Sequence, residues 1–341
     1  MIRVGLILAV TVGLALTPLA GSAASDRFVL WSARTAGARA VPLRVLPADL
    51  PGDVAGDPSI AVLDRTTGGR LAVAERNDVV IENAHGSGRA VLQIADVYDG
   101  RFSPDGSQLA LASLGCPPAG LSCLTLTIVG SDGSNVQTMR GGAARWLSDR
   151  TLTYVRNVAA NGVGTLVLAD PDGRALRVLG KSYALPHVAP VPSPNGYLVA
   201  DQCKAQLICV RTTTSPVRVL VRFRGASASS PLWSPNGRRI ALTLAGNYTS
   251  TTSVGTVKTA RLEPISSPIS LQIDDSIIGW SPDSSTILVQ RRCFGPAVCS
   301  DQVFSEVLAT HARHRLTHDD LEWESVRWTN TSLTYVTPPH T

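Results

Sequence analysis

Hydrophobic and polar residues alternate in short runs along most of the chain. In "RRIALTL" (residues 238–244) and "SQLALAS" (residues 107–113), isoleucine or leucine stands at alternate positions. This period of two residues predicts β-strands, because successive side chains of a strand point to opposite faces. No segment has a long period of 3.6 residues, and the sequence therefore predicts an all-β protein.

The strands recur in a repeated phrase. It reads "RFSPDGSQLALAS" near residue 101, "LWSPNGRRIALTL" near residue 232 and "GWSPDSSTILVQR" near residue 279. In Ser-Pro-Asp-Gly, proline has the fixed φ of the first central position of a tight turn, Asp suits the second, and Gly follows them. Aligning the phrase gives seven anchor residues, which are Leu63, Phe102, Trp146, Pro192, Trp233, Trp280 and Trp328.

The anchors lie about 44 residues apart, and each copy has room for four short strands. Four strands in about 40–45 residues are typical of a β-propeller blade. After Trp328 the chain supplies one more strand, whereas two strands, near residues 26–46, precede the first anchor. We therefore predict a seven-bladed β-propeller of four-stranded antiparallel blades, with the last blade closed by strands from both termini. Such closure removes the open edges of a linear stack.

The phrase also points to a known family. Trp-Ser-Pro-Asn-Gly, Phe-Ser-Pro-Asp-Gly and Trp-Ser-Pro-Asp-Ser, each before an alternating strand, resemble the repeat of TolB-type, WD-like β-propellers. The copies at Trp146 and Trp328 lack the proline, and Pro192 replaces the aromatic anchor. The resemblance implies that the turn joins the first two strands of each blade, and that the protein serves in envelope protein complexes. We interpret the anchor tryptophans as packing between blades rather than as an aromatic platform for a ligand.

The N-terminus has the features of an export signal. Arg3 precedes an apolar run at residues 4–16, and small residues follow at 21–24. The run is shorter than the roughly 20 residues that a membrane-spanning helix needs. We predict a signal peptide at residues 1–24 and one propeller domain at residues 25–341, with an uncleaved anchor as the alternative. The exported chain is expected to be a monomer that is secreted, periplasmic or associated with the envelope, with no membrane span after cleavage.

Six cysteines form three local pairs. In an exported protein such pairs predict disulfides, and the alternative of zinc lacks histidines at ligand spacing. Every pair lies between the second and third strands of a blade, and the predicted bonds are Cys116–Cys123, Cys203–Cys209 and Cys293–Cys299.

The net charge of +5 comes from scattered residues, nearly all of them arginine. No arginine cluster is interleaved with aromatic residues, and so no nucleic-acid partner is expected. A weakly positive protein could still attract an acidic envelope polymer. His311, His314 and His318 are close in sequence, but only His314 and His318 would share a strand face. We therefore expect no metal and no cofactor.

Two functions remain open. No catalytic signature of a hydrolase, metalloprotease or nucleotide-binding enzyme occurs. We favour a non-catalytic module that binds an envelope protein, a peptide or a polar polymer, and keep as alternative a hydrolase or lyase with its site at the channel mouth. Charged residues before the anchors are expected at that mouth, and the candidate binding residues are Asp96, Asp99, Arg101, Arg145, His187, Asp274, Asp275, Glu324 and Arg327.

Overall fold

The computed structural model consists of β-strands joined by turns and loops. It describes residues 29–34, 41–45, 60–66, 68–75, 77–83, 86–115, 123–184, 189–205, 207–224, 231–245, 250–258, 261–264, 273–281, 283–293, 302–316, 325–329 and 332–337. The prediction of an all-β protein is confirmed.

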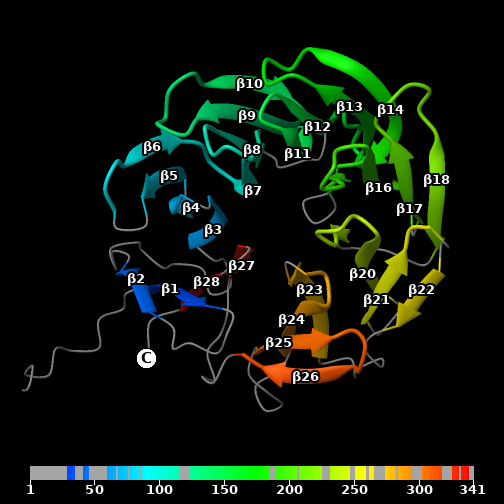
Figure 1. Cartoon of the computed structure of the whole chain (residues 1–341). Coiled ribbons are helices and arrows are strands. Elements are labelled where there is room, and N and C mark those ends of the chain that lie inside the picture. Colours follow the sequence, from blue (N-terminus) through cyan, green and yellow to red (C-terminus); the bar gives the residue numbers. More distant parts are fainter. Residues whose placement is uncertain are drawn as a thin grey trace, which may run out of the picture.

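Six four-stranded antiparallel sheets are each built from consecutive strands and stand around a centre like the blades of a propeller (Figure 1). In chain order their strands are β3 (Ile60–Arg65), β4 (Arg70–Glu75), β5 (Asp78–Asn83) and β6 (Ala90–Gln93); β7 (Val97–Phe102), β8 (Gln108–Leu114), β9 (Leu124–Gly130) and β10 (Gln137–Arg140); β11 (Gly142–Ser148), β12 (Thr151–Arg156), β13 (Val163–Ala169) and β14 (Ala175–Tyr183); β15 (Val191–Pro192), β16 (Leu198–Lys204), β17 (Leu207–Thr212) and β18 (Val219–Arg224); β19 (Leu232–Trp233), β20 (Arg239–Ala245), β21 (Ser250–Thr256) and β22 (Arg261–Pro264); and β23 (Ile273–Trp280), β24 (Thr286–Cys293), β25 (Gln302–Val307) and β26 (Ala312–Arg315).

Strands from the two ends of the described chain pair with each other. The order of this sheet is β2-β1-β28-β27, formed by β1 (Val29–Arg34), β2 (Val41–Val45), β27 (Ser325–Thr329) and β28 (Ser332–Thr337). Val29 of β1 lies opposite Thr337 of β28, and the pairing is antiparallel.

Every anchor residue lies in an edge strand of its sheet, from Leu63 in β3 to Trp328 in β27, and in the six sheets of consecutive strands this is the first strand. Because each of the six sheets of consecutive strands is an antiparallel meander, its connections emerge on two opposite faces of the ring. The turns between first and second strands and between third and fourth strands lie on one face, called here the turn face. The hairpins between second and third strands lie with the links between blades on the other, called here the connection face.

The repeated phrase forms the turn that its residues predict. The amide of Gly106 donates to the carbonyl of Ser103 at 2.8 Å, and Gly106 has a φ of 72°. Ser103 is buried, and its Oγ donates to Asp105 Oδ1 at 2.6 Å and accepts from the amide of Gln108 at 3.0 Å. Ser193, Ser234 and Ser281 make the corresponding bonds in their own turns. The serine therefore ties the turn to the start of the second strand.

The anchor tryptophans join each blade to the one before it. In each case the indole Nε1 donates to a main-chain carbonyl in the first strand of the preceding blade. Trp146 donates to Arg101 at 2.9 Å, Trp233 to Val191 at 2.8 Å and Trp280 to Leu232 at 3.0 Å. Trp233 and Trp280 are also buried. The interpretation of these side chains as packing between blades is confirmed at the three positions.

The hydrophobic core lies between blades rather than at the centre of the ring. One cluster joins Leu63 and Ala72 of the β3–β6 sheet to Phe102 and Leu109 of the β7–β10 sheet. The other described clusters also join neighbouring sheets. Burying a leucine or phenylalanine contributes about 1.5–3 kcal/mol, and so each blade depends on its neighbours. No helix among the described residues has the length and apolarity to cross a membrane.

Candidate functional site

Three of the predicted binding residues meet on the innermost strands. Asp99 of β7 is buried, and its Oδ2 accepts a hydrogen bond from Nη1 of Arg145 on β11. Arg101 places Nη2 at 3.7 Å from Asp99 Oδ1, and its Nη1 donates to the carbonyl of Leu63 on β3 at 2.7 Å. The cluster therefore links the first strands of three consecutive blades.

The environment of this cluster fixes what it can do. Burial lowers the pKa of Arg145, and the neighbouring charge of Asp99 acts in the opposite direction. A buried carboxylate that already binds a guanidinium is poorly placed to act as a general base, because losing the partner would leave an uncompensated charge. The side chain of Arg101 is 26% exposed, against 13% for Arg145. Arg101 is therefore the member of the cluster that can contact a ligand.

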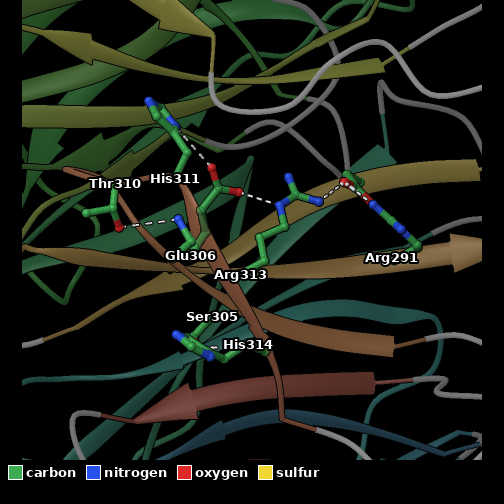
Figure 2. Close-up of polar contacts among 9 residues, drawn as sticks. Arg291, Ser305, Glu306, Thr310, His311, Arg313 and His314 are labelled. Carbon is green, nitrogen blue, oxygen red and sulfur yellow. Dashed lines mark hydrogen bonds and ion pairs between the residues drawn. The ribbon is translucent and has the colours of Figure 1, made fainter.

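A second charged network runs across the sheet of β23 to β26. Asp275 is 1% exposed and binds Arg291 through two hydrogen bonds of 2.9 and 3.1 Å. Arg313 donates to Asp275 at 3.1 Å and to Glu306 at 2.6 Å, while Nδ1 of His311 lies 3.4 Å from the other oxygen of Glu306. Figure 2 shows the path from His311 through Glu306 and Arg313 toward Arg291.

The network in this sheet holds two buried carboxylates in place. Glu306 is fully buried, like Asp275. The hydrogen bond to Asp275 raises the pKa of Arg291, while burial opposes the shift. The guanidinium carbon of Arg291 also stands 5.2 Å from the centre of the Phe304 ring, within the range of a cation–π contact. The histidine run contributes only His311 to this network; the carbonyl of His314 on β26 accepts from Ser305 at 3.5 Å, and His318 lies outside the described residues.

The other predicted binding residues are spread over the ring. Asp96 is exposed before β7, with a φ of 54°, and its carbonyl accepts from the amide of Leu114. Asp274 and Arg327 lie on β23 and β27, and His187 and Glu324 lie outside the described residues. Asp275 joins the second network and not the cluster at Asp99. The innermost strands run from one face of the ring to the other, and the seven described positions span both ends of these strands.

One predicted disulfide lies within the described residues. Cys203 of β16 and Cys209 of β17 are bonded, with their Cα atoms 5.7 Å apart. The bond closes a hairpin on the connection face, and a loop of this size gains about 2 kcal/mol by chain entropy. Cys123 is disulfide-bonded too, whereas Cys116 and Cys299 lie outside the described residues. The other two pairings stay predictions.

A buried ion pair beside this disulfide was not foreseen from the sequence. Arg211 donates from Nε and Nη2 to the two oxygens of Asp201, at 2.7 and 3.1 Å. It also donates to the carbonyls of Leu179 and Lys181 on β14 of the preceding blade, at 3.1 and 2.7 Å. Burial raises the pKa of Asp201, against the effect of the guanidinium. Charged residues at buried positions of two alternating strands, "LVADQC" and "LICVRT", were the available signal.

The described residues contain no group of three or more histidine, cysteine, aspartate or glutamate side chains arranged to hold a metal ion. What they do contain on the inner strands are carboxylates held by arginines. Such an arrangement positions main chain and offers a few charged hydrogen-bond donors to a ligand.

Comparison with known proteins gives the fold. No model of a protein family matches the chain, and no curated protein matches its sequence. A solved structure assigned as a TolB from Agrobacterium tumefaciens is similar with a TM-score of 0.56 and 12% identity, over 92% of this chain and 99% of that one. The β-propeller domain of Cps50 (Swd1) from Myceliophteria thermophila is similar with a TM-score of 0.56 and 11% identity, over 83% of this chain and 97% of that one. The chain thus has the fold of TolB-like and WD-type β-propellers.

Proposed function

We propose that this protein is an exported, non-catalytic propeller that binds a polypeptide partner through its connection face. The observation that carries the proposal is the disulfide Cys203–Cys209, which closes the β16–β17 hairpin on that face. A hairpin that is already ordered loses less conformational entropy on binding than a loose loop does. Oxidised cysteines also suit a compartment outside the cytoplasm.

The two faces of the ring differ in the surface that they offer. A specific interface needs on the order of 800 Å² from each partner. The turn face is built from tight turns such as the one at Ser103–Gly106, whose polar side chains form hydrogen bonds with one another. The connection face carries the hairpins and the links between blades. We therefore assign the partner to the connection face.

The charged groups of the inner strands support binding over catalysis. Asp99 is held by Arg145, and Asp275 by Arg291 and Arg313. Each carboxylate is thereby fixed as an ion-pair partner. Groups of this kind shape a rigid channel wall, and Arg101 extends the charge of that wall to the solvent.

The proposal includes the organisation of the whole chain. Residues 1–24 act as the signal peptide, and residues 25–341 form one propeller of seven blades. The last blade is completed by β1 and β2 from the N-terminal end and by β27 and β28 from the C-terminal end, and the observed pairing of β1 with β28 supports this closure.

The test compares the two faces of the folded, oxidised protein. Partners are captured from an envelope fraction, identified by mass spectrometry, purified and measured for affinity to each variant. Lys204→Glu changes an exposed position at the end of β16, and Cys203→Ser with Cys209→Ser opens the same hairpin. We expect both changes to weaken the partner's affinity.

The control is Asn236→Asp on the turn face. Asn236 accepts from Ser234 through Oδ1, and aspartate makes the same bond in the turn at Ser103, so the fold is retained. Affinity should be unchanged in this variant. If Asn236→Asp abolishes binding while both changes in the hairpin leave it intact, the partner is on the turn face and the proposal is wrong.

A further inference from the structure

A small pocket opens on the turn face between the β19–β22 and β23–β26 blades. Its volume is about 230 Å³, and its walls are Arg239, Val254, Ser285, Val307, Leu308, Ala309 and His311. Arg239 begins β20, and Ser285 belongs to the first turn of the next blade. The amide of Leu308 donates to the carbonyl of Ser285 at 3.0 Å, which ties together the two turns that form one wall.

The floor of the pocket is aliphatic. Val254 is buried in the cluster between these two blades, and Leu308 packs against the same cluster. A hydrophobic group that enters the pocket therefore contacts side chains already held by the core. The volume is below the range of about 300–1,000 Å³ that drug-sized ligands occupy. The pocket fits a short branched group.

The rim carries one cation, Arg239. Arg239 is exposed, and among the described residues no carboxylate forms an ion pair with its guanidinium. In the β23–β26 blade, by contrast, Arg291 pairs with Asp275 and Arg313 with Glu306. A guanidinium binds carboxylates well, because its N–H groups match the two oxygens.

The other polar groups of the rim are already engaged. Nδ1 of His311 faces Glu306 at 3.4 Å, as Figure 2 shows, and the hydroxyl of Ser285 donates to Asp283 at 2.7 Å. The carboxylate of Asp283 also accepts from Ser281 and from the amide of Ser285, so its charge is partly compensated. Arg239 is left as the group that selects the charge of the ligand.

We propose that this pocket binds a carboxylate attached to a short branched aliphatic group. The carboxylate pairs with Arg239, and the aliphatic group rests on Val254, Val307 and Leu308. Two sources have this chemistry, namely a free short-chain acid and the C-terminal residue of a peptide ending in valine or leucine. The pocket lies on the turn face, and so the inference stands apart from the partner proposed for the connection face.

The experiment measures binding of isovalerate to the full, oxidised protein by calorimetry and by NMR of valine and leucine methyl groups. Isovalerate should bind with a millimolar dissociation constant and shift the methyl signals of Val254, Val307 and Leu308. Acetate, which lacks the branched group, should bind at least tenfold more weakly, since about three buried carbons are lost. Isovaleramide, which lacks the charge, should not bind measurably.

Two variants test whether Arg239 is the arginine that binds the carboxylate. Arg239→Gln should weaken isovalerate binding by on the order of tenfold, the usual effect of losing a charged hydrogen bond. Arg238→Gln removes the adjacent exposed arginine, which does not line the pocket, and should change affinity by less than about twofold. Equal losses in both variants, an unchanged affinity in Arg239→Gln, or equal binding of acid and amide would overturn the proposal.

N-acetyl-Gly-Val with a free C-terminus, and the same peptide amidated, separate the two sources. Tighter binding of the free-terminus peptide than of isovalerate assigns the site to a chain terminus, whereas binding of isovalerate alone assigns it to a free acid. In both cases the carboxylate and the branched group carry the recognition. Binding of the amidated peptide at the strength of the acid would contradict it.

Discussion

Replacing Arg211 with methionine should strongly destabilise the protein. Asp201 is 0% exposed. Arg211 donates two hydrogen bonds to the carboxylate of Asp201, and it also donates to the carbonyls of Leu179 and Lys181. Removing one partner of a buried pair costs about 3–5 kcal/mol, because the remaining charge is left uncompensated. We expect Arg211→Met to lower the free energy of unfolding by that amount.

A double variant separates the charge from the other bonds. Asp201→Leu with Arg211→Met removes both charges, and well-packed apolar replacements of a buried pair are often neutral or stabilising. Both variants lose the bonds to the carbonyls on β14, so the difference between them isolates the unpaired carboxylate. The double variant should therefore be more stable than Arg211→Met alone.

Urea unfolding of the oxidised protein, followed by tryptophan fluorescence, measures these differences. The matched control is Arg174→Met, which removes an arginine that is 79% exposed and pairs with Asp170 at 3.0 Å. Pairs on the surface contribute about 0–1 kcal/mol, and so this variant should be nearly as stable as the original. A loss below about 1 kcal/mol in Arg211→Met, or a double variant that is less stable than the single one, would refute the reasoning.

Three further predictions follow from individual residues. Gly180→Ala should destabilise the protein, because Gly180 has a φ of 134° and an added Cβ would lie 2.1 Å from Nη1 of Arg211. Gly68→Ala should not, because the atom nearest to an added Cβ there is 3.8 Å away. Thermal unfolding of both variants checks this prediction. Hydroxyl and amide donors lower the pKa of Asp283 to about 2, so its contribution to stability should be present above the unfolded value near 3.9 and be lost as the pH falls toward 2. NMR titration measures that pKa. An ordinary aspartate pKa, or an Asp283→Asn variant that loses as much stability in acid as the original protein, would contradict the prediction. Peptide mapping without reduction should place each cysteine pair in one small fragment, namely Cys116–Cys123, Cys203–Cys209 and Cys293–Cys299, and a bond between blades would show that the local pairing is wrong.

The repeated phrase was sufficient to predict the blades, because its effects are local. The alternation of apolar residues defines each strand, and the turn at Ser103–Gly106 depends on atoms within six residues of one another. The same holds for the hairpin of Cys203 and Cys209, which is closed by residues near in sequence. The candidate site was harder to predict, since sequence position relative to an anchor does not say which charged side chains meet.

The sequence by itself determined the all-β class, the period of the blades and the turn that joins their first two strands. Only the tertiary structure decided which groups from different blades come together. Asp99 and Arg145 pair across neighbouring blades, Arg211 reaches the edge of β14, and Arg239 faces the turns of the next blade across a pocket. These contacts join residues about 30 to 70 positions apart, and they form only when the inter-blade core fixes the distance and angle between two sheets.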